Sequence, residues 1–230
     1  MKKESLTLNK PDLNGDDLLS KVRKDFIGLD TKYKIATGET SKRIYLDSTA
    51  STLMMGAACR ATNKFLNHYA NTHSLMHFSA KISTKTYNWV HDRMLNFVNA
   101  DPKEYTCFFT GSGSTAGMNR LARAFTNFRS NKDVVLISIM EHHSNDLPHR
   151  KHSNNVIHIP VDTHESKLGS IDLNLLEKYL IRYENKVNYV SITGISNVTG
   201  IINPINKVAA LAHKYGAYIM VDAAQMAAHV

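Results

Sequence analysis

Short apolar runs and amphipathic segments follow one another along most of this chain. Runs such as VNYVSIT at 187–193 are apolar on both faces, which is typical of buried strands. Between such runs, for example within 173–184, apolar residues recur at the i, i+3, i+4 and i+7 spacing of one helix face. This pattern predicts strands at 44–47, 106–110, 133–139, 156–161, 187–193 and 218–221, and helices at 56–69, 83–99, 113–128, 173–184 and 203–215.

The alternation of strands and helices predicts an α/β fold, with a mostly parallel sheet and helices on both of its faces. Residues 1–43 are polar and weakly periodic, so we interpret them as an N-terminal extension with one short helix within 16–27. Residues 44–230 are then expected to form the folded domain.

Composition and charge exclude few classes of protein. The net charge of +8 comes from lysines and arginines spread along the chain, which favours an anionic small ligand over nucleic acid. The run at 134–140 is too short to span a membrane and the N-terminus has no signal-peptide core, so we expect a soluble, cytoplasmic protein. Cys59 and Cys107 lack metal-ligand spacing and are expected to be buried thiols.

Candidate chemistry follows the predicted strands, because ligands of parallel sheets gather at the carboxyl ends of the strands. After the strand at 106–110, the segment GSGST (111–115) opens a helix. Helix N-termini bind anions, and Ser114 and Thr115 add hydroxyl donors. The alternative is a tight turn with a Ser/Thr helix cap.

The segment EHHSNDLPHRKH (141–152) follows the strand at 133–139 and contains four histidines. Because His142 and His143 are adjacent and Pro148 is expected to interrupt any helix, a metal site is not favoured. The segment is either a solvated loop or the source of one imidazole that stacks on a flat ring.

Two further strand ends carry polar side chains. Asn197 in GISNVTG (194–200) is either an amide donor to a ligand or part of an Asx turn. Asp222 and Gln225 follow the last strand, and alone they fit a variant capping box. Taken together, the strand ends suit pyridoxal phosphate, a phosphorylated ring whose basic nitrogen needs a carboxylate.

Several blocks of the sequence, in unbroken order, resemble class V aminotransferases, the fold-type-I pyridoxal-phosphate group that includes cysteine desulfurases and selenocysteine lyases. The similar blocks are IYLDSTAST (44–52), YANTHSLMH (69–77), FFTGSGSTAGMN (108–119), SIMEHHSNDLP (138–148), VSITGISNVTGIINPI (190–205) and LAHKYGAYIMVDAAQ (211–225). The resemblance implies a pyridoxal-phosphate enzyme acting on an amino acid, with cysteine desulfuration or selenocysteine lysis favoured. It also implies a homodimer for the full-length form.

The resemblance assigns roles to single residues. His142 would stack on the cofactor ring and Asp222 would pair with its pyridine nitrogen. Asn197 and Gln225 would lie near the ring's phenolic oxygen and the substrate. The remaining implied contacts are phosphate binding by Ser114 and Thr115, and substrate contacts by Ser48, Asn71, Thr72 and His73.

Two departures from the family pattern are Ser48-Thr49-Ala50 in place of Asn-Ala-Ala, and Ala116 in place of a common glutamate. In the family, the Schiff-base lysine follows the Asp-x-x-Gln block. The given sequence is therefore expected to be a C-terminally truncated part of a large domain, inactive alone. The open alternatives are a non-catalytic remnant or partner subunit, an epimerase-like or transaminase activity, and a His-rich metal-binding protein.

Overall fold

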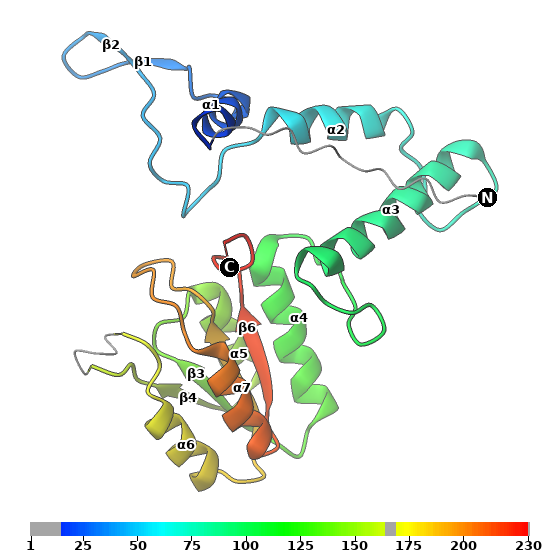
Figure 1. Ribbon diagram of the computed structural model, residues 1–230. Helices are drawn as coiled ribbons and strands as arrows, with labels where there is room; N and C mark the ends of the chain where they lie inside the picture. The colour runs from blue at the N-terminus through cyan, green and yellow to red at the C-terminus, as the bar shows by residue number, and fades with distance from the viewer. Residues whose placement is uncertain (1–14, 164–168, 230) are drawn as a thin grey trace. The chain divides into compact units, whose positions relative to one another are not determined.

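The computed structural model describes residues 15–163 and 169–229 of the chain (Figure 1). The chain divides between Val90 and His91 into two compact units. The domain boundary expected after residue 43 stays a prediction.

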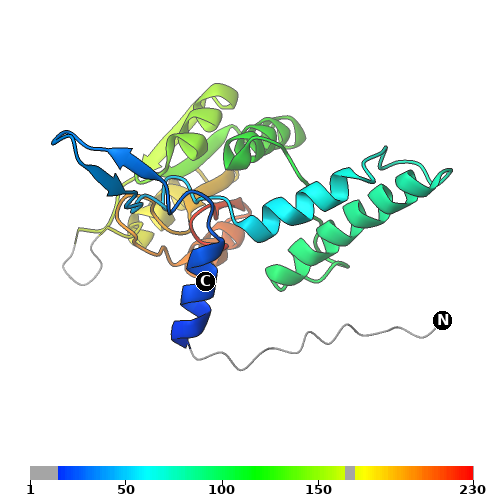
Figure 2. The same cartoon turned by 90° about the horizontal axis from the view of Figure 1, so that it is seen from above.

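The first unit contains two helices, a small hairpin and most of a third helix. α1 (Gly15–Asp25) confirms the short helix expected in the extension. The strands β1 (Lys32–Lys34) and β2 (Thr40–Lys42) pair antiparallel and lie side by side in Figure 2, although the sequence did not predict this hairpin. α2 (Gly56–Leu66) and α3 (Phe78–Phe97) overlap the helices predicted at 56–69 and 83–99.

The prediction of a strand at 44–47 is wrong. Ile44 and Leu46 are 80% and 90% exposed, and the backbone there is irregular. A run of four residues is too weak a signal when no neighbouring strand pairs with it.

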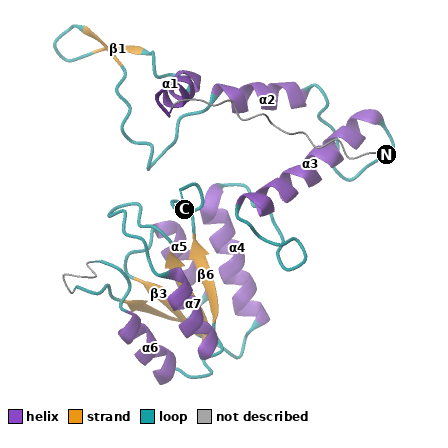
Figure 3. Ribbon diagram, in the orientation of Figure 1, coloured by secondary structure: helices purple, strands orange, loops and turns teal. Residues whose placement is uncertain are grey.

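The second unit is an α/β structure built on four parallel strands (Figure 3). In spatial order they are β4 (Asn155–Ile159), β3 (Val134–Ser138), β5 (Val187–Thr193) and β6 (Tyr218–Asp222). The helices are α4 (Gly113–Phe128), α5 (His143–His152), α6 (Leu173–Arg182) and α7 (Ile205–Lys214). This confirms the predicted parallel sheet.

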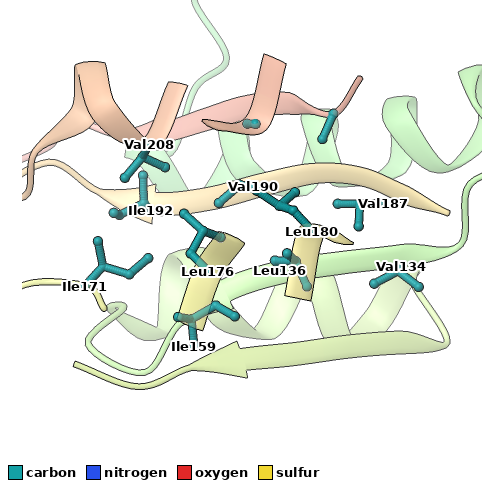
Figure 4. Packing of buried hydrophobic residues seen from close by; sticks show 12 residues of the cluster. Val134, Leu136, Ile159, Ile171, Leu176, Leu180, Val187, Val190, Ile192 and Val208 are labelled. Carbon is teal, nitrogen blue, oxygen red and sulfur yellow. The ribbon is translucent and has the colours of Figure 1, made fainter. Parts of the chain in front are cut away.

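Buried side chains cover both faces of the sheet, because every residue of β3 and β5 is buried. On one face, residues of α6 and α7 such as Leu176 and Val208 pack against Leu136 and Val190, as Figure 4 shows. On the other face, Met118 of α4 packs with Ile137 and with residues of β5 and β6. The helices therefore lie on both faces, as predicted.

The predicted strand at 106–110 is absent from the structure. Its segment pairs with no described strand, and Phe108 is exposed. The ring of Phe109 instead packs edge-on against His91, with ring centroids 4.7 Å apart. Cys107, like Cys59, is a free and partly exposed thiol, so the prediction that both cysteines are buried is wrong.

The largest error concerns α5, which was expected to be a loop broken by Pro148. The helix continues through Pro148, although proline lacks the N–H of an internal helix position. Tertiary packing offsets this cost, because Asn145 and His149 are completely buried on one face of the helix. Among the described residues, no helix has the length and apolar character needed to cross a membrane.

The core of the second unit should depend on α6. Replacing Leu176, which is fully buried, with alanine removes a large side chain from the cluster under α6 and α7. We expect the free energy of unfolding to fall by about 2–5 kcal/mol, measured by urea denaturation. Ile181→Ala on the same helix, where the side chain is 55% exposed, is the matched control. Equal losses in the two variants would contradict the assignment of this core.

Candidate functional site

Polar side chains gather at the carboxyl ends of β3, β5 and β6. β3 is followed by residues 139–142 and then α5, while β6 ends at Asp222 itself. β5 lies between these two strands, and its last residue, Thr193, pairs in register with Asp222. The sheet therefore brings together segments that are far apart in the sequence.

His142 and Asp222 are joined through Ser144. His142 is the N-cap residue of α5, and its Nδ1 accepts a hydrogen bond of 3.1 Å from the Ser144 backbone N–H. The Ser144 Oγ lies 2.8 Å from the same Nδ1 and 3.5 Å from Oδ2 of Asp222, to which it donates. The two residues that the sequence singled out thus belong to one cluster, connected by a serine that it overlooked.

Asp222 is only 4% exposed, and hydrogen bonds hold both its side chain and its backbone carbonyl. Its Oδ1 accepts from the Ala224 N–H at 3.1 Å, and its backbone carbonyl accepts from the Gly194 N–H at 2.8 Å. Residues 224–229 form turns rather than a regular helix. The contact of Asp222 with the N–H two residues on is one that a helix-capping aspartate can make, so the capping alternative stays open.

The charge of Asp222 has no cationic partner within the described part of the chain. A buried carboxylate is costly unless it is paired with a cation or well supplied with hydrogen bonds. Asp222 has two donors to its carboxylate, of which one is at 3.5 Å. The site therefore suits a ligand that brings a positively charged N–H group.

Glu141 is a second carboxyl group in this cluster. It accepts hydrogen bonds from the Ser138 hydroxyl, from Asn145 Nδ2 at 2.6 Å and from the Thr193 N–H at 2.9 Å. Burial, with a smaller contribution from the nearby Asp222, raises the pKa of Glu141 to about 7. Glu141 thereby ties the ends of β3 and β5 to the first turn of α5.

A fully buried polar network continues from Asn145 along α5. Asn145 Oδ1 accepts from the Ser191 hydroxyl at 2.8 Å and from His149 Nε2 at 3.0 Å. Because His149 Nε2 then carries the ring proton, Nδ1 accepts from the Tyr189 hydroxyl at 2.8 Å. Burial lowers the pKa of His149 to about 4 and raises that of Tyr189, so both groups are neutral near pH 7.

The N-terminus of α4 lies at the same edge of the sheet. At the other end of this helix, the Arg129 guanidinium donates to the carbonyls of Asn188 and Gly216, which stand at the starts of β5 and β6. Because α4 runs antiparallel to the strands, its first turn lies toward their carboxyl ends, as in Figure 1. Ser114 and Thr115, both in that turn, are therefore on the side of Asp222.

The first turn of α4 is open to an anion. Ser112 occupies the N-cap position without a side-chain cap, and the turn contains no acidic residue. Gly111 and Gly113 have positive φ angles of 93° and 60°, which form the tight turn before the helix. The hydroxyl cap of the alternative reading is absent. The Gly113 N–H donates to the Gly111 carbonyl at 2.7 Å, so the N–H groups that suit a ligand are those of Ser114 and Thr115.

Asn197 lies exposed in the turn after β5. The Ser196 Oγ, not Asn197, organises this turn, since it accepts from the N–H groups of Val198 and Thr199 at 3.2 Å each. The Asx-turn alternative is therefore wrong, and the role of Asn197 toward a ligand stays a prediction.

The residues predicted on the substrate side belong to the first unit. Ser48 helps to line a cavity of about 210 Å³ beside α1, and Asn71 Oδ1 accepts from the His73 N–H at 2.6 Å. Their proposed contacts with a substrate stay predictions. In residues 15–163 and 169–229, no group of three or more His, Cys, Asp or Glu side chains is arranged to hold a metal ion.

Comparison with known proteins identifies the family of this chain. Residues 44–230 match the family model for aminotransferase class-V, and the chain belongs to that family. The structure is similar to an apo cysteine desulfurase from Thermococcus onnurineus NA1, with a TM-score of 0.75 and 24% identity over 92% of this chain and 48% of that one. This likeness shows the fold.

Sequence relatives are cysteine desulfurases by name. The "Probable cysteine desulfurase" of Halalkalibacterium halodurans is 30% identical over 196 residues, which are 83% of this chain and 46% of that protein. The "Cysteine desulfurase" of Escherichia coli O9:H4 (strain HS) is 33% identical over 193 residues, 80% of this chain and 45% of that protein. The chain spans about half the length of the curated relatives it matches.

Sequence reasoning missed the residues that support the site: Glu141, Ser144, Asn145, His149 and Tyr189. A signal was present, because Glu141, Asn145 and His149 follow one another at a spacing of four, which places them on one face of a helix. Reading Pro148 as the end of any helix concealed that pattern.

The raised pKa of Glu141 predicts a specific pH dependence of stability. The folded form holds the proton more tightly than the unfolded chain, whose pKa is 4.5. The stabilisation is therefore complete below pH 4.5 and is lost as the pH rises to about 7. Relative to Glu141→Gln, which does not titrate, the wild type should become progressively less stable across that interval in urea denaturation.

The stability of the wild type must be compared with that of Glu141→Gln, because His149 is present in both proteins and has the opposite effect on how stability changes with pH. Its lowered pKa stabilises the fold above pH 6.5 and this contribution is lost as the pH falls to about 4. Glu184→Gln on the surface is the matched control for loss of a carboxylate. A constant stability difference between wild type and Glu141→Gln from pH 4.5 to 7 would contradict a buried, proton-binding Glu141.

Proposed function

We propose that the site at the carboxyl ends of the strands holds pyridoxal 5′-phosphate, and that the chain forms part of a cysteine desulfurase-like enzyme. The observation that carries this proposal is the buried carboxylate of Asp222, which has no cationic partner in the described residues and is joined through Ser144 to His142. Membership of the class V family and the names of the relatives support it.

The residues present fit this cofactor. Its phosphate matches the uncapped first turn of α4, where Ser114 and Thr115 add hydroxyl groups. The exposed imidazole of His142, fixed in orientation by two contacts to Ser144, suits one face of the ring. By the family resemblance, Asn197 and Gln225 would lie near the ring oxygen.

Pyridoxal phosphate, when bound, supplies an electron sink for reactions at the α-carbon of amino acids. The task of Asp222 is to hold a proton on the ring nitrogen, and burial strengthens that ion pair because water does not screen it. The α4 N–H groups would bind the phosphate and His142 would orient the ring. Glu141 and Asn145 keep the first turn of α5 in place, so the two sides of the site stay in register.

The activity of the whole protein belongs to the same proposal. Cysteine is the favoured amino-acid substrate, in a cytoplasmic homodimer whose Schiff-base lysine follows the sequence given. An epimerase-like or transaminase reaction would use the same ring contacts. A non-catalytic remnant or partner subunit would keep the sheet without turnover.

Binding of pyridoxamine 5′-phosphate tests the cofactor site directly. This compound carries the ring and the phosphate but no aldehyde, so its affinity does not depend on a lysine. We expect the 230-residue chain to bind it, and Asp222→Asn to weaken binding by about tenfold or more, since asparagine removes the charge but keeps a hydrogen-bond acceptor. Isothermal titration calorimetry measures the dissociation constants, and melting temperatures report the fold.

Asp172→Asn is the matched control. Asp172 caps α6 and accepts from the Leu175 N–H at 2.9 Å, and asparagine caps helices about as well as aspartate. The affinity of Asp172→Asn for pyridoxamine 5′-phosphate should equal that of the wild type. If Asp222→Asn and the wild type bound the compound with equal affinity, the electrostatic role of Asp222 would be contradicted. If the wild type did not bind the compound, the proposed cofactor site would be contradicted.

Catalysis is tested in a chain that includes the Schiff-base lysine. We expect sulfide release from L-cysteine, with Asp222→Asn lowering kcat and kcat/KM together by orders of magnitude, because the ring proton matters most in the transition state. Residues 1–230 alone should release none and should form no borohydride-stable linkage at a specific lysine. Wild-type turnover by a well-folded Asp222→Asn enzyme would contradict the mechanism.

A further inference from the structure

We propose that Ser144 is a positioning residue whose hydroxyl couples the imidazole of His142 to the carboxylate of Asp222. The coupling itself is a property of the chain. Its use, keeping the two sides of a bound ring in register, rests on the proposed function.

Ser144 touches both groups. It lies in the first turn of α5 and is 7% exposed, with Oγ 2.8 Å from Nδ1 of His142 and 3.5 Å from Oδ2 of Asp222. Its backbone N–H also donates to Nδ1 at 3.1 Å. A hydrogen-bonded path therefore runs from an exposed ring to a buried charge.

The hydroxyl has one proton, so its two contacts are linked. When the His142 ring is neutral, Nδ1 accepts from the Ser144 N–H, which leaves the ring proton on Nε2. The Ser144 hydroxyl then directs its one proton either to Nδ1, at 2.8 Å, or to Oδ2 of Asp222, at 3.5 Å. A change of charge at Asp222 should therefore alter the hydrogen bonding of the His142 ring through Ser144.

The surroundings allow this coupling to be removed without loss of the fold. Asn145 donates to Glu141 at 2.6 Å and is bonded to Ser191 and His149, so the first turn of α5 has its own anchor. Ser144→Ala deletes the hydroxyl and keeps the backbone N–H cap. Ser144→Thr keeps both.

The test is a double-mutant comparison by NMR on the 230-residue chain with ¹⁵N-labelled histidine. The His142 ring signals are assigned with His142→Gln, and those of His149 serve as an internal report on the fold. Asp222→Asn should shift the His142 ring nitrogens in the wild-type background and in Ser144→Thr. In Ser144→Ala we expect the shift to shrink to about a third or less, as for residues coupled through a shared partner.

Binding of pyridoxamine 5′-phosphate gives the second readout. We expect Ser144→Ala to weaken it by about fivefold, the usual value of one hydrogen bond, and Ser144→Thr to stay within about twofold of wild type. Equal Asp222→Asn shifts in the serine and alanine backgrounds, with His149 unchanged, would overturn the coupling.

The two proposals fail separately. If no variant binds the compound, the cofactor proposal is lost while the ring shifts still decide whether Ser144 couples the two groups. If the compound binds but Ser144→Ala has wild-type affinity, the hydroxyl has no positioning role toward the ring.

Discussion

The burial of the Asp222 carboxylate at the end of β6 is the constraint on which the rest of the site depends. An anion in this position is costly unless something supplies donors or a positive charge. The chain supplies the Ala224 N–H and the Ser144 hydroxyl, and in the described residues it supplies no cation. We therefore expect a ligand to supply the positive charge beside Asp222, and a protonated ring nitrogen has the required charge and shape.

The supporting network explains how such a charge is held in place. Glu141, Asn145, His149 and Tyr189 are hydrogen-bonded in sequence beneath the site, and burial keeps His149 neutral near pH 7. Fully satisfied buried networks of this kind fix a single arrangement, because each broken contact would leave a polar group without water. The same network lets α5 tolerate Pro148 in its interior. Stability and site geometry thus come from the same side chains.

Much of the second unit could be predicted from the sequence because its signals are local. The strand at 187–193 and the helix at 113–128 have the predicted limits, since their apolar patterns are long and regular. His142 and Asp222 could be placed at one sheet edge because His142 follows one strand of the parallel sheet and Asp222 ends another. The residues at 44–47 and 106–110 were mistaken for strands, because a short apolar run does not reveal whether a neighbouring strand pairs with it.

Other features depend on contacts that no local pattern contains. The role of Ser144 appears only once the first turn of α5 lies at the end of β6. The burial of Asn145 and His149 decides that residues 143–152 are helical. The contacts predicted for Ser48, Asn71 and His73 lie in the first unit and stay predictions.

The central claim is that Asp222 holds a proton on a ring nitrogen. The most direct measurement is the ¹⁵N chemical shift of pyridoxamine 5′-phosphate, labelled in the ring and bound to the chain, because protonation of a pyridine nitrogen moves its resonance strongly. The account predicts a protonated ring nitrogen at neutral and mildly alkaline pH, and a largely unprotonated one in Asp222→Asn. An unprotonated ring nitrogen in the wild-type complex at neutral pH would contradict it.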